Sequence, residues 1–310
     1  MKKPLIGTFA ALLFAGATAL AGAPAAVASS PADARTAPAA ATEAQVAAQT
    51  LADPQLQASS QDQQARAAVN FAGTVALSNC SGSLVRLPAS AATDPALILS
   101  NGHCLETGFP GPGQVVVNQS SSRTFSLLNG TGSKVATLRA NKVVYGTMTD
   151  TDVSIYQLNT TYAAIQSSYG IAPLTISASH PVQGTSIKVV SGYWKKTYSC
   201  SVDGFVYRLK EGSWTWKDSV RYTSSCNTIG GTSGSPVIDT STGQVIAVNN
   251  TGNEDGERCT DNNPCEVDQN GVVTVRQGIN YAQETYGIPA CFAAGNRLDL
   301  TRAGCTLPRP

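Results

Sequence analysis

From about residue 70 onward, the chain is a succession of short apolar or alternating runs, each bounded by Gly, Pro, Ser, Asn or Asp. Short runs between turn signals predict β-strands, because helices need longer stretches with a period of about 3.6 residues. The strands expected from this pattern span residues 73–77, 83–87, 96–99, 114–117, 124–128, 134–144, 153–158, 186–190, 204–209, 219–223, 236–238, 244–248 and 272–275.

Two further local signals complete the expected secondary structure. The turn at 240–243, Thr-Ser-Thr-Gly, should join two strands as a hairpin. Only residues 281–286 are expected to be helical, as a short helix near the C-terminus. The fold class predicted from these signals is all-β.

The expected strands form two groups of similar size, separated by a segment at 162–181 that is rich in Pro, Ser and Ala. This spacing favours two small antiparallel β-barrels packed together, the first at about 69–162 and the second at about 182–290. A single large sandwich is the alternative that the pattern leaves open.

The N-terminal segment has the pattern of an export signal. Met1-Lys2-Lys3 precedes an apolar run, and Ala26-Val27-Ala28 resembles a cleavage site, so residues 1–28 are predicted to be a signal peptide. A transmembrane anchor is the alternative, but Gly and Thr interrupt the run. Residues 29–68 are poor in aromatic and β-branched residues and are expected to be a propeptide or N-terminal extension. The folded domain is then expected at 69–310.

Eight cysteines in a chain with an export signal favour disulfides over metal sites. A zinc site needs reduced thiolates, usually in closely spaced pairs that this sequence lacks. Spacing alone does not fix the connectivity, but it suggests four local pairs, which are Cys80–Cys104, Cys200–Cys226, Cys259–Cys265 and Cys291–Cys305.

The net charge of +1 gives no reason to expect binding to nucleic acid or to an anionic membrane. The sequence contains two histidines, His103 and His180, which excludes a three-histidine metal centre. Neither a metal nor another cofactor is expected. The scarcity of histidine also leaves few candidates for a catalytic base.

Four motifs occur in an order that carries chemical meaning. They are Asn-Cys-Ser-Gly-Ser-Leu-Val at 79–85, Leu-Ser-Asn-Gly-His-Cys at 99–104, Thr-Asp-Val-Ser-Ile-Tyr-Gln-Leu at 151–158 and Gly-Gly-Thr-Ser-Gly-Ser-Pro at 230–236. In this order the chain resembles the chymotrypsin-like (trypsin-fold) serine peptidases over roughly residues 71–285. The resemblance implies two six-stranded antiparallel barrels with the active site between them. It also implies that Cys80 pairs with Cys104.

The resemblance assigns a role to each catalytic position. Ser233 is the expected nucleophile, His103 the base that accepts its proton, and Asp152 the carboxylate that orients the imidazole. The backbone N–H groups of Gly231 and Ser233 are the expected oxyanion hole.

Three other residues compete with this assignment. Asp150 is the alternative to Asp152, but it is expected to cap a turn. Ser235 is the alternative nucleophile, but it directly precedes Pro236. His180 precedes a proline in the connecting segment and is expected at the surface.

Rival hydrolase folds require another order of residues. An α/β-hydrolase places its histidine after the serine, and no histidine follows Ser233. A subtilisin-like enzyme needs an alternating α/β pattern, which this chain lacks.

Thr232 separates this chain from trypsin itself. Trypsin-type zymogens place an Asp before the nucleophile, where it pairs with a new α-amino group, whereas the neutral Thr232 resembles the glutamyl-endopeptidase-type branch. We therefore expect that removal of the N-terminal extension relieves a steric block or aids export.

The substrate pocket is expected to be polar and uncharged. By resemblance it is formed by Asn227, Asn249 and Thr251, since the charged or histidine residues used elsewhere in the family are absent from these positions. The acidic loop at 254–257 is an alternative that would favour a basic substrate. A calcium site formed by the carboxylates of that region, Asp255, Glu257 and Asp261, is a further alternative.

The sequence thus predicts a secreted, disulfide-bonded serine endopeptidase of the zymogen type that acts on polypeptides through an acyl-enzyme. It is expected to be a monomer without a cofactor or membrane anchor. A catalytically silent binding protein and a secreted esterase on the same scaffold are the alternatives.

Overall fold

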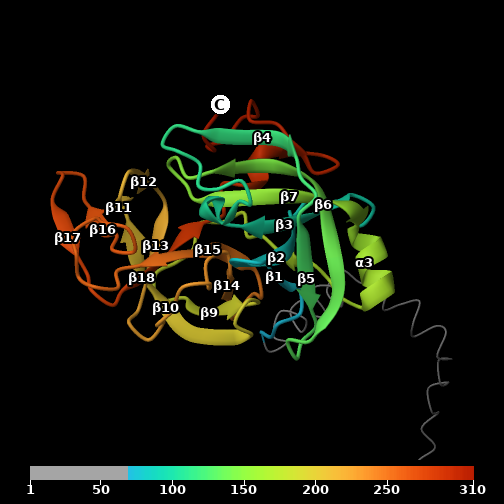
Figure 1. The fold of residues 1–310 in the computed structure, drawn as a ribbon, viewed down its shortest axis with the longest axis horizontal. Coiled ribbons are helices and arrows are strands. Elements are labelled where there is room, and N and C mark those ends of the chain that lie inside the picture. The colour runs from blue at the N-terminus through green and yellow to red at the C-terminus, as the bar shows by residue number, and fades with distance from the viewer. Residues whose placement is uncertain (1–68) are drawn as a thin grey trace, which may run out of the picture. The chain divides into compact units, whose positions relative to one another are not determined.

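The computed structural model describes residues 69–310, so the predicted signal peptide and N-terminal extension lie outside the described residues. Figure 1 shows two antiparallel β-barrels. The first closes in the order β1 (Thr74–Ala76), β5 (Thr124–Leu128), β6 (Lys134–Thr147), β7 (Val153–Thr161), β3 (Pro95–Ser100) and β2 (Ser81–Arg86). Two further strands extend it, with β4 (Val115–Ser120) pairing with β6 and β8 (Leu174–Thr175) lying parallel to β2.

The second barrel also has six strands. It closes in the order β10 (Lys196–Val206), β13 (Ser219–Tyr222), β18 (Asn280–Glu284), β15 (Val245–Gly252), β14 (Pro236–Asp239) and β9 (Ser186–Ser191). The predicted turn at 240–243 joins β14 to β15, which pair as an antiparallel hairpin. The predicted fold class, two six-stranded barrels, is therefore confirmed.

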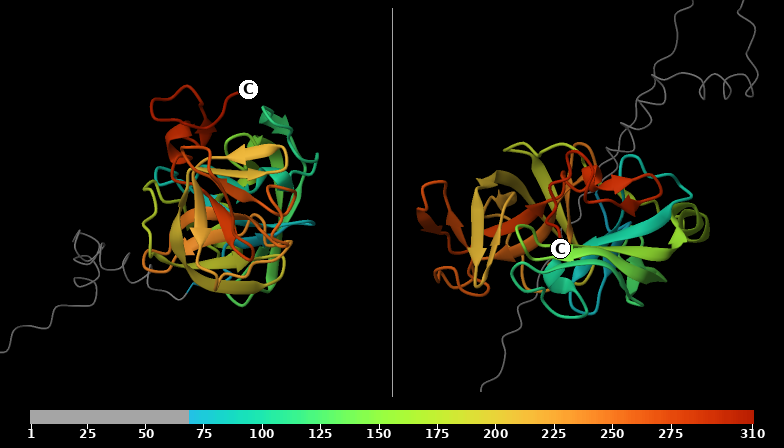
Figure 2. Two further views of the ribbon diagram at one scale, coloured as in Figure 1. Left: turned by 90° about the vertical axis from the view of Figure 1, so that its left-hand side faces the viewer. Right: turned by 90° about the horizontal axis from the view of Figure 1, so that it is seen from above.

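The two barrels share an apolar core. Ile98 of β3 packs inside the first barrel, while its neighbours Leu97 and Leu99 face outward into a second cluster. That cluster also contains Val190 and Ile238 from the second barrel. Because both faces of β3 are buried, its sequence is a continuous apolar run rather than an alternating one. Figure 2 shows the barrels from two further directions.

A separate four-stranded sheet extends from the second barrel. Its order is β12 (Trp214–Trp216), β11 (Arg208–Glu211), β16 (Cys265–Val267) and β17 (Val273–Val275). Arg221 of β13 links this sheet to the barrel through an ion pair with Glu266 of β16, and it also pairs with Asp203 of β10 within the barrel. The strand predicted at 204–209 is in fact divided between β10 and β11, because the chain passes there from the barrel into this sheet.

The short helix lies elsewhere than predicted. Residues 281–286, expected to be helical, contain most of β18, whose residues are all buried between β13 and β15, because barrel closure needs a strand there. The helix is α3 (Tyr162–Tyr169), in the connection between the barrels. Thr161 caps its N-terminus by accepting a hydrogen bond from the Ala164 N–H. No helix within 69–310 has the length and apolar character needed to cross a bilayer.

The C-terminal segment returns to the first barrel. It contains β19 (Phe292–Ala293) and β20 (Arg297–Leu298), preceded by a short 3-10 turn, Pro289–Cys291. Asn296 donates to the Tyr162 hydroxyl at 3.0 Å, and Tyr145 donates to the Pro308 carbonyl at 3.0 Å. These bonds fix the end of the chain beside the barrel interface.

Four disulfides are present, and they join the cysteine pairs that the spacing suggested. They are Cys80–Cys104, Cys200–Cys226, Cys259–Cys265 and Cys291–Cys305. The first joins the end of the β1–β2 turn to the 3-10 turn Gly102–Cys104, which carries His103.

Glu284 of β18 should make stability depend on pH. Its side chain is 1% exposed, and Oε1 lies 3.4 Å from Nε2 of His180, which is half-exposed. Burial, reinforced by the charge of Asp218, raises the pKa of Glu284 from 4.5 to about 8. The folded state therefore holds a proton that the unfolded chain releases near pH 4.5, so stability falls as pH rises from about 4.5 to about 8.

Glu284→Gln should reduce this loss, and denaturant unfolding at pH 5 and pH 9 measures it. The exposed Glu254→Gln is the control and should keep the wild-type pH dependence. An unchanged dependence in Glu284→Gln would contradict the assignment.

Candidate active site

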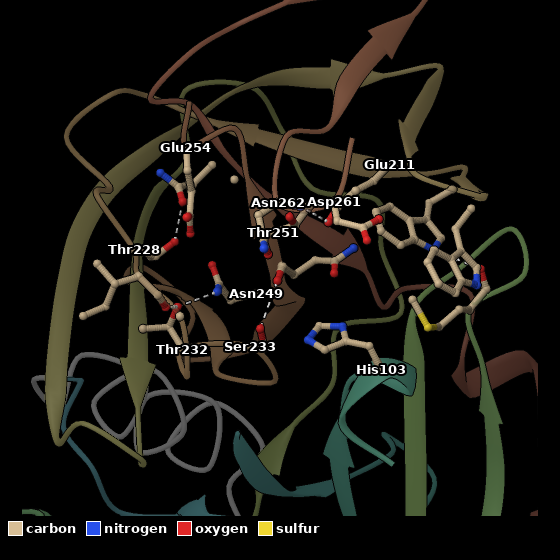
Figure 3. Close-up of a pocket in the computed structure, with 18 of the residues that line it drawn as sticks. His103, Glu211, Thr228, Thr232, Ser233, Asn249, Thr251, Glu254, Asp261 and Asn262 are labelled. Carbon is tan, nitrogen blue, oxygen red and sulfur yellow. Dashed lines mark hydrogen bonds between the residues drawn. The ribbon is translucent and has the colours of Figure 1, made fainter. Parts of the chain in front are cut away.

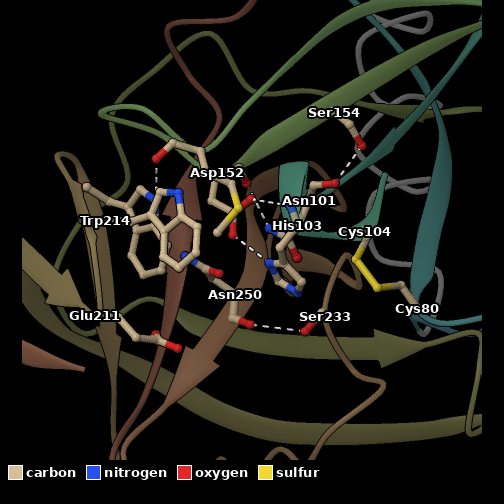
Figure 4. Close-up of polar contacts among 12 residues, drawn as sticks. Cys80, Asn101, His103, Cys104, Asp152, Ser154, Glu211, Trp214, Ser233 and Asn250 are labelled. Carbon is tan, nitrogen blue, oxygen red and sulfur yellow. Dashed lines mark hydrogen bonds and ion pairs between the residues drawn. A yellow bond between two sulfur atoms is a disulfide. The ribbon is translucent and has the colours of Figure 1, made fainter. Parts of the chain in front are cut away.

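The pairing of two adjacent strands brings His103 and Asp152 together. Ser100 at the end of β3 lies opposite Ser154 near the start of β7, so the residues just beyond the two strand ends are neighbours. His103 Nδ1 lies 2.6 Å from Asp152 Oδ2, and the His103 backbone N–H donates to Oδ1 at 3.0 Å. The carboxylate is fully buried, so this contact holds the ring in one orientation (Figure 4).

Asn101 stabilises the His103–Asp152 pair through two backbone contacts, a role that the sequence patterns did not indicate. Its side-chain amide donates to the Asp152 carbonyl at 2.8 Å, and its own carbonyl accepts from Ser154 Oγ at 2.7 Å. Both bonds are buried. They fix the two strand ends relative to each other.

The electrostatic environment favours the charged form of His103. Burial lowers the pKa of His103, but the charge of Asp152 and its hydrogen bond outweigh this effect and raise the pKa above 6.5. The carboxylate of Glu211 adds to the increase. A proton accepted by His103 is therefore stabilised, as a general base requires.

Ser233 comes from the second barrel and faces His103 across a cavity (Figure 3). Its loop docks on the first barrel, where the Ser81 N–H donates to the Ser233 carbonyl at 2.8 Å. Gly234 has φ +81°, and a Cβ there would lie 2.1 Å from the Ser81 carbonyl oxygen. Only glycine allows this close approach.

The Ser233 hydroxyl donates to the Asn250 carbonyl at 3.2 Å, and among the described residues it makes no hydrogen bond to His103. Rotation about one side-chain bond redirects the hydroxyl. Catalytic hydrogen bonds are often formed only when substrate is present.

Two of the three competing residues, Ser235 and Asp150, lie elsewhere. Ser235 is fully buried and does not line the cavity. Asp150 forms an ion pair with Lys217 and, in the described part of the chain, makes no hydrogen bond or ion pair with His103. The structure thus brings together His103, Asp152 and Ser233.

The expected oxyanion donors are available. Gly231 has φ +84°, a left-handed conformation that glycine adopts without strain. Within residues 69–310, the N–H groups of Gly231 and Ser233 donate to no other protein group. These two groups can therefore receive a hydrogen-bond acceptor from a ligand.

Of the three residues predicted to form the substrate pocket, two line the cavity. The cavity has a volume of about 300 Å³, and Asn249 and Thr251 form part of its wall. Asn227 is exposed and lies outside it, so the structure does not bring Asn227 together with the other two. The next residue, Thr228, takes the inward position because its hydroxyl donates to Asn280 Oδ1 at 2.8 Å.

The cavity is lined by acidic residues, unlike the uncharged substrate pocket expected from the sequence. Glu211, Glu254 and Asp261 line it, and none of its lining residues in the described chain is lysine or arginine. Burial raises the pKa of Glu211, although the Asn262 N–H donates to Oε1 at 2.9 Å and opposes this increase. The sequence analysis missed Glu211 because it did not separate β11 from β10.

Metal ligands do not converge in this region. The candidate calcium ligands Asp255, Glu257 and Asp261 form no compact group among residues 69–310. The one compact group of potential ligands there contains Cys80, His103 and Cys104, whose two cysteines are bonded to each other.

Thr232 is held by a neutral, buried network. Its hydroxyl donates to the Ile229 carbonyl and accepts from Asn249 Nδ2 at 3.1 Å. The Tyr222 hydroxyl in turn donates to Asn249 Oδ1 at 3.2 Å. The residue before Ser233 is therefore anchored to β13 and β15 without an ion pair.

Comparison with protein families identifies the class of protein to which the chain belongs. The sequence matches the trypsin-like peptidase domain over residues 80–248, which is more than half of the chain. The chain belongs to this family and is a trypsin-like peptidase. The resemblance to trypsin-fold peptidases is confirmed, while the glutamyl-endopeptidase-type branch stays a prediction.

The chain is also similar to several solved structures. The active form of the Rv3671c protease from M. tuberculosis is 15% identical with a TM-score of 0.42, covering 83% of this chain and 90% of that chain. A Glu endopeptidase in complex with MPD is 18% identical with a TM-score of 0.40, covering 70% and 86%. The Nocardiopsis protease NAPase is 15% identical with a TM-score of 0.38, covering 70% and 93%. No protein of curated function matches the sequence.

Thr232→Val should weaken both stability and activity. It keeps the side-chain shape but leaves the Asn249 amide without its acceptor, which costs about 1–3 kcal/mol for a buried polar group. The Ser233 loop then loses an anchor, so kcat should fall. Thermal unfolding and steady-state kinetics measure the two effects.

The matched control is Thr240→Val, which removes an exposed hydrogen bond to the Ser186 carbonyl. It should leave both quantities nearly unchanged. Wild-type stability and kcat in Thr232→Val would contradict the anchoring role.

Proposed function

We propose that this protein is a secreted serine endopeptidase that cleaves polypeptides through an acyl-enzyme, with His103, Asp152 and Ser233 as its triad. The observation that carries the proposal is the 2.6 Å contact between His103 Nδ1 and Asp152 Oδ2, with Ser233 on the same cavity. Membership of the trypsin-like peptidase family supports the same reaction class.

In the proposed mechanism, the Ser233 hydroxyl rotates from the Asn250 carbonyl toward His103 Nε2. Ser233 Oγ attacks the scissile carbonyl while His103 takes its proton, and Asp152 stabilises the imidazolium. The Gly231 and Ser233 N–H groups bind the oxyanion. His103 then protonates the leaving amine, and a water activated by His103 hydrolyses the acyl ester.

Secretion is supported by two observations. The sequence of residues 1–28 has the pattern of a signal peptide, and the four disulfides are typical of oxidising compartments. We further propose that the protein acts as a monomer and that processing of residues 29–68 precedes activity. A silent binding protein is disfavoured, because it has no need of a buried carboxylate bonded to the histidine that faces Ser233.

Covalent labelling tests the nucleophile. A fluorophosphonate should modify Ser233 in the correctly oxidised protein, and Ser233→Ala should lose both labelling and peptide hydrolysis. The matched control is Ser235→Ala, which removes a buried hydroxyl two residues away and should retain both. Absence of an adduct in folded wild-type protein would refute the proposal, and cleavage of esters but not of peptides would favour the esterase.

The acidic cavity predicts a preference for cationic side chains. A lysine or arginine in the cavity gains a charge-assisted hydrogen bond, so Glu211→Gln should lower kcat/KM for basic peptides by about ten- to hundred-fold. Glu254 is exposed, so Glu254→Gln should lower it by less than about ten-fold. Neutral peptides should be cleaved nearly as before. Asp255→Asn, an exposed carboxylate outside the cavity, is the control. A peptide-library profile without basic preference would contradict this prediction.

A further inference from the structure

The turn between β9 and β10 reaches the loop that precedes Ser233. There the indole N–H of Trp194 donates to the Gly230 carbonyl at 2.7 Å, although half of the Trp194 surface is exposed. The turn itself is well held, because the Trp194 backbone N–H donates to the buried hydroxyl of Ser191 at 3.2 Å. Trp194 is therefore a fixed donor beside the loop.

The Gly230 carbonyl that Trp194 binds belongs to the same peptide group as the Gly231 N–H. The Gly230 carbonyl and the Gly231 N–H are parts of one planar trans peptide, so they point in opposite directions. A donor that holds the carbonyl on one side therefore directs the N–H to the other side. In the described residues that N–H has no protein acceptor, and it is one of the two proposed oxyanion donors.

Few other contacts restrain the orientation of the Gly230–Gly231 peptide. Glycine lies on both sides of it, and glycine permits the backbone rotations that turn a peptide over. The Gly231 carbonyl accepts from Ser81 Oγ at 3.2 Å, but this bond restrains the following peptide. Among residues 69–310, the Trp194 indole is the one hydrogen-bonding partner of the Gly230 carbonyl.

The indole also lies close to Gly231 itself. A Cβ at position 231 would lie 2.9 Å from Trp194 Nε1, so the ring packs against the space that a side chain would fill. Trp194 does not line the cavity, and among the described residues it makes no hydrogen bond to His103 or Ser233. The indole N–H is bonded to the loop backbone, and the ring also packs edge-on against Tyr193.

We propose that Trp194 is a positioning residue for the oxyanion hole, whose indole N–H holds the Gly230–Gly231 peptide with the Gly231 N–H directed at the oxyanion. This inference rests on the proposed peptidase function. It assigns to an exposed tryptophan a role that no motif in the sequence indicates.

Trp194→Phe keeps an aromatic ring but removes the N–H donor. It should lower kcat by about ten- to hundred-fold, somewhat less than deletion of an oxyanion donor, and leave KM within about two-fold. Affinity for a peptide aldehyde, which forms a tetrahedral adduct, should fall in parallel with kcat. The pH midpoint of kcat should not move, because His103 is untouched.

Tyr193→Phe is the matched control on the same turn. It removes a hydroxyl that makes no hydrogen bond to the described residues and should keep wild-type kcat and aldehyde affinity. Where Trp194→Phe does not fold, benzothienylalanine at position 194 preserves both rings and replaces only the N–H by sulfur. It should show the same loss.

The outcomes separate the two proposals. If wild-type protein hydrolyses peptides and both Trp194 variants keep kcat and aldehyde affinity within about two-fold, the role of Trp194 is refuted and the peptidase function stands. A loss that appears in KM alone also refutes it, because that pattern indicates substrate contact. If folded wild-type protein is neither active nor labelled on Ser233, the peptidase function itself fails.

Discussion

The approach of one backbone to another at Gly234 is the constraint on which the site depends. His103 and Asp152 come from the first barrel and Ser233 from the second, so neither barrel alone contains a reactive centre. The two meet where Gly234 lies against the Ser81 carbonyl, at a distance that excludes a side chain. The apolar cluster shared by the barrels keeps this contact in place. Packing of the two barrels against each other therefore also brings His103, Asp152 and Ser233 together.

Neutral hydrogen bonds, rather than ion pairs, hold the loop around Ser233. Thr232 is anchored through Asn249 to Tyr222, and burial raises the pKa of the Tyr222 hydroxyl well above its usual value. None of these groups titrates near the pKa of His103. The loop can therefore keep its shape while His103 gains and loses a proton. It also needs no charged chain terminus, which agrees with the absence of an acidic residue before Ser233.

Much of this arrangement was predictable, because local signals specify it. Strand runs bounded by turn residues predicted both barrels, and motif order predicted the residues that meet at the cavity. The predictions that were wrong or missing concern features that depend on contacts between segments distant in the sequence. Residues 281–284, expected to be helical, belong to strand β18 because barrel closure outweighs local helical preference. Trp194 lies beside the site because of the path of the β9–β10 turn, and Glu211 because of the path of strand β11. No local sequence pattern predicts either path.

The acidic cavity and the catalytic base are coupled through Glu211. Its charge contributes to the raised pKa of His103 and also attracts a cationic substrate group. A bound cation offsets that charge, so binding lowers the pKa of His103 toward its value without Glu211. By linkage, the unprotonated base and the cationic substrate favour each other by the same free energy. A bound cationic substrate group therefore removes part of the pKa increase that Glu211 causes, so His103 is unprotonated more often in the complex than in the free protein.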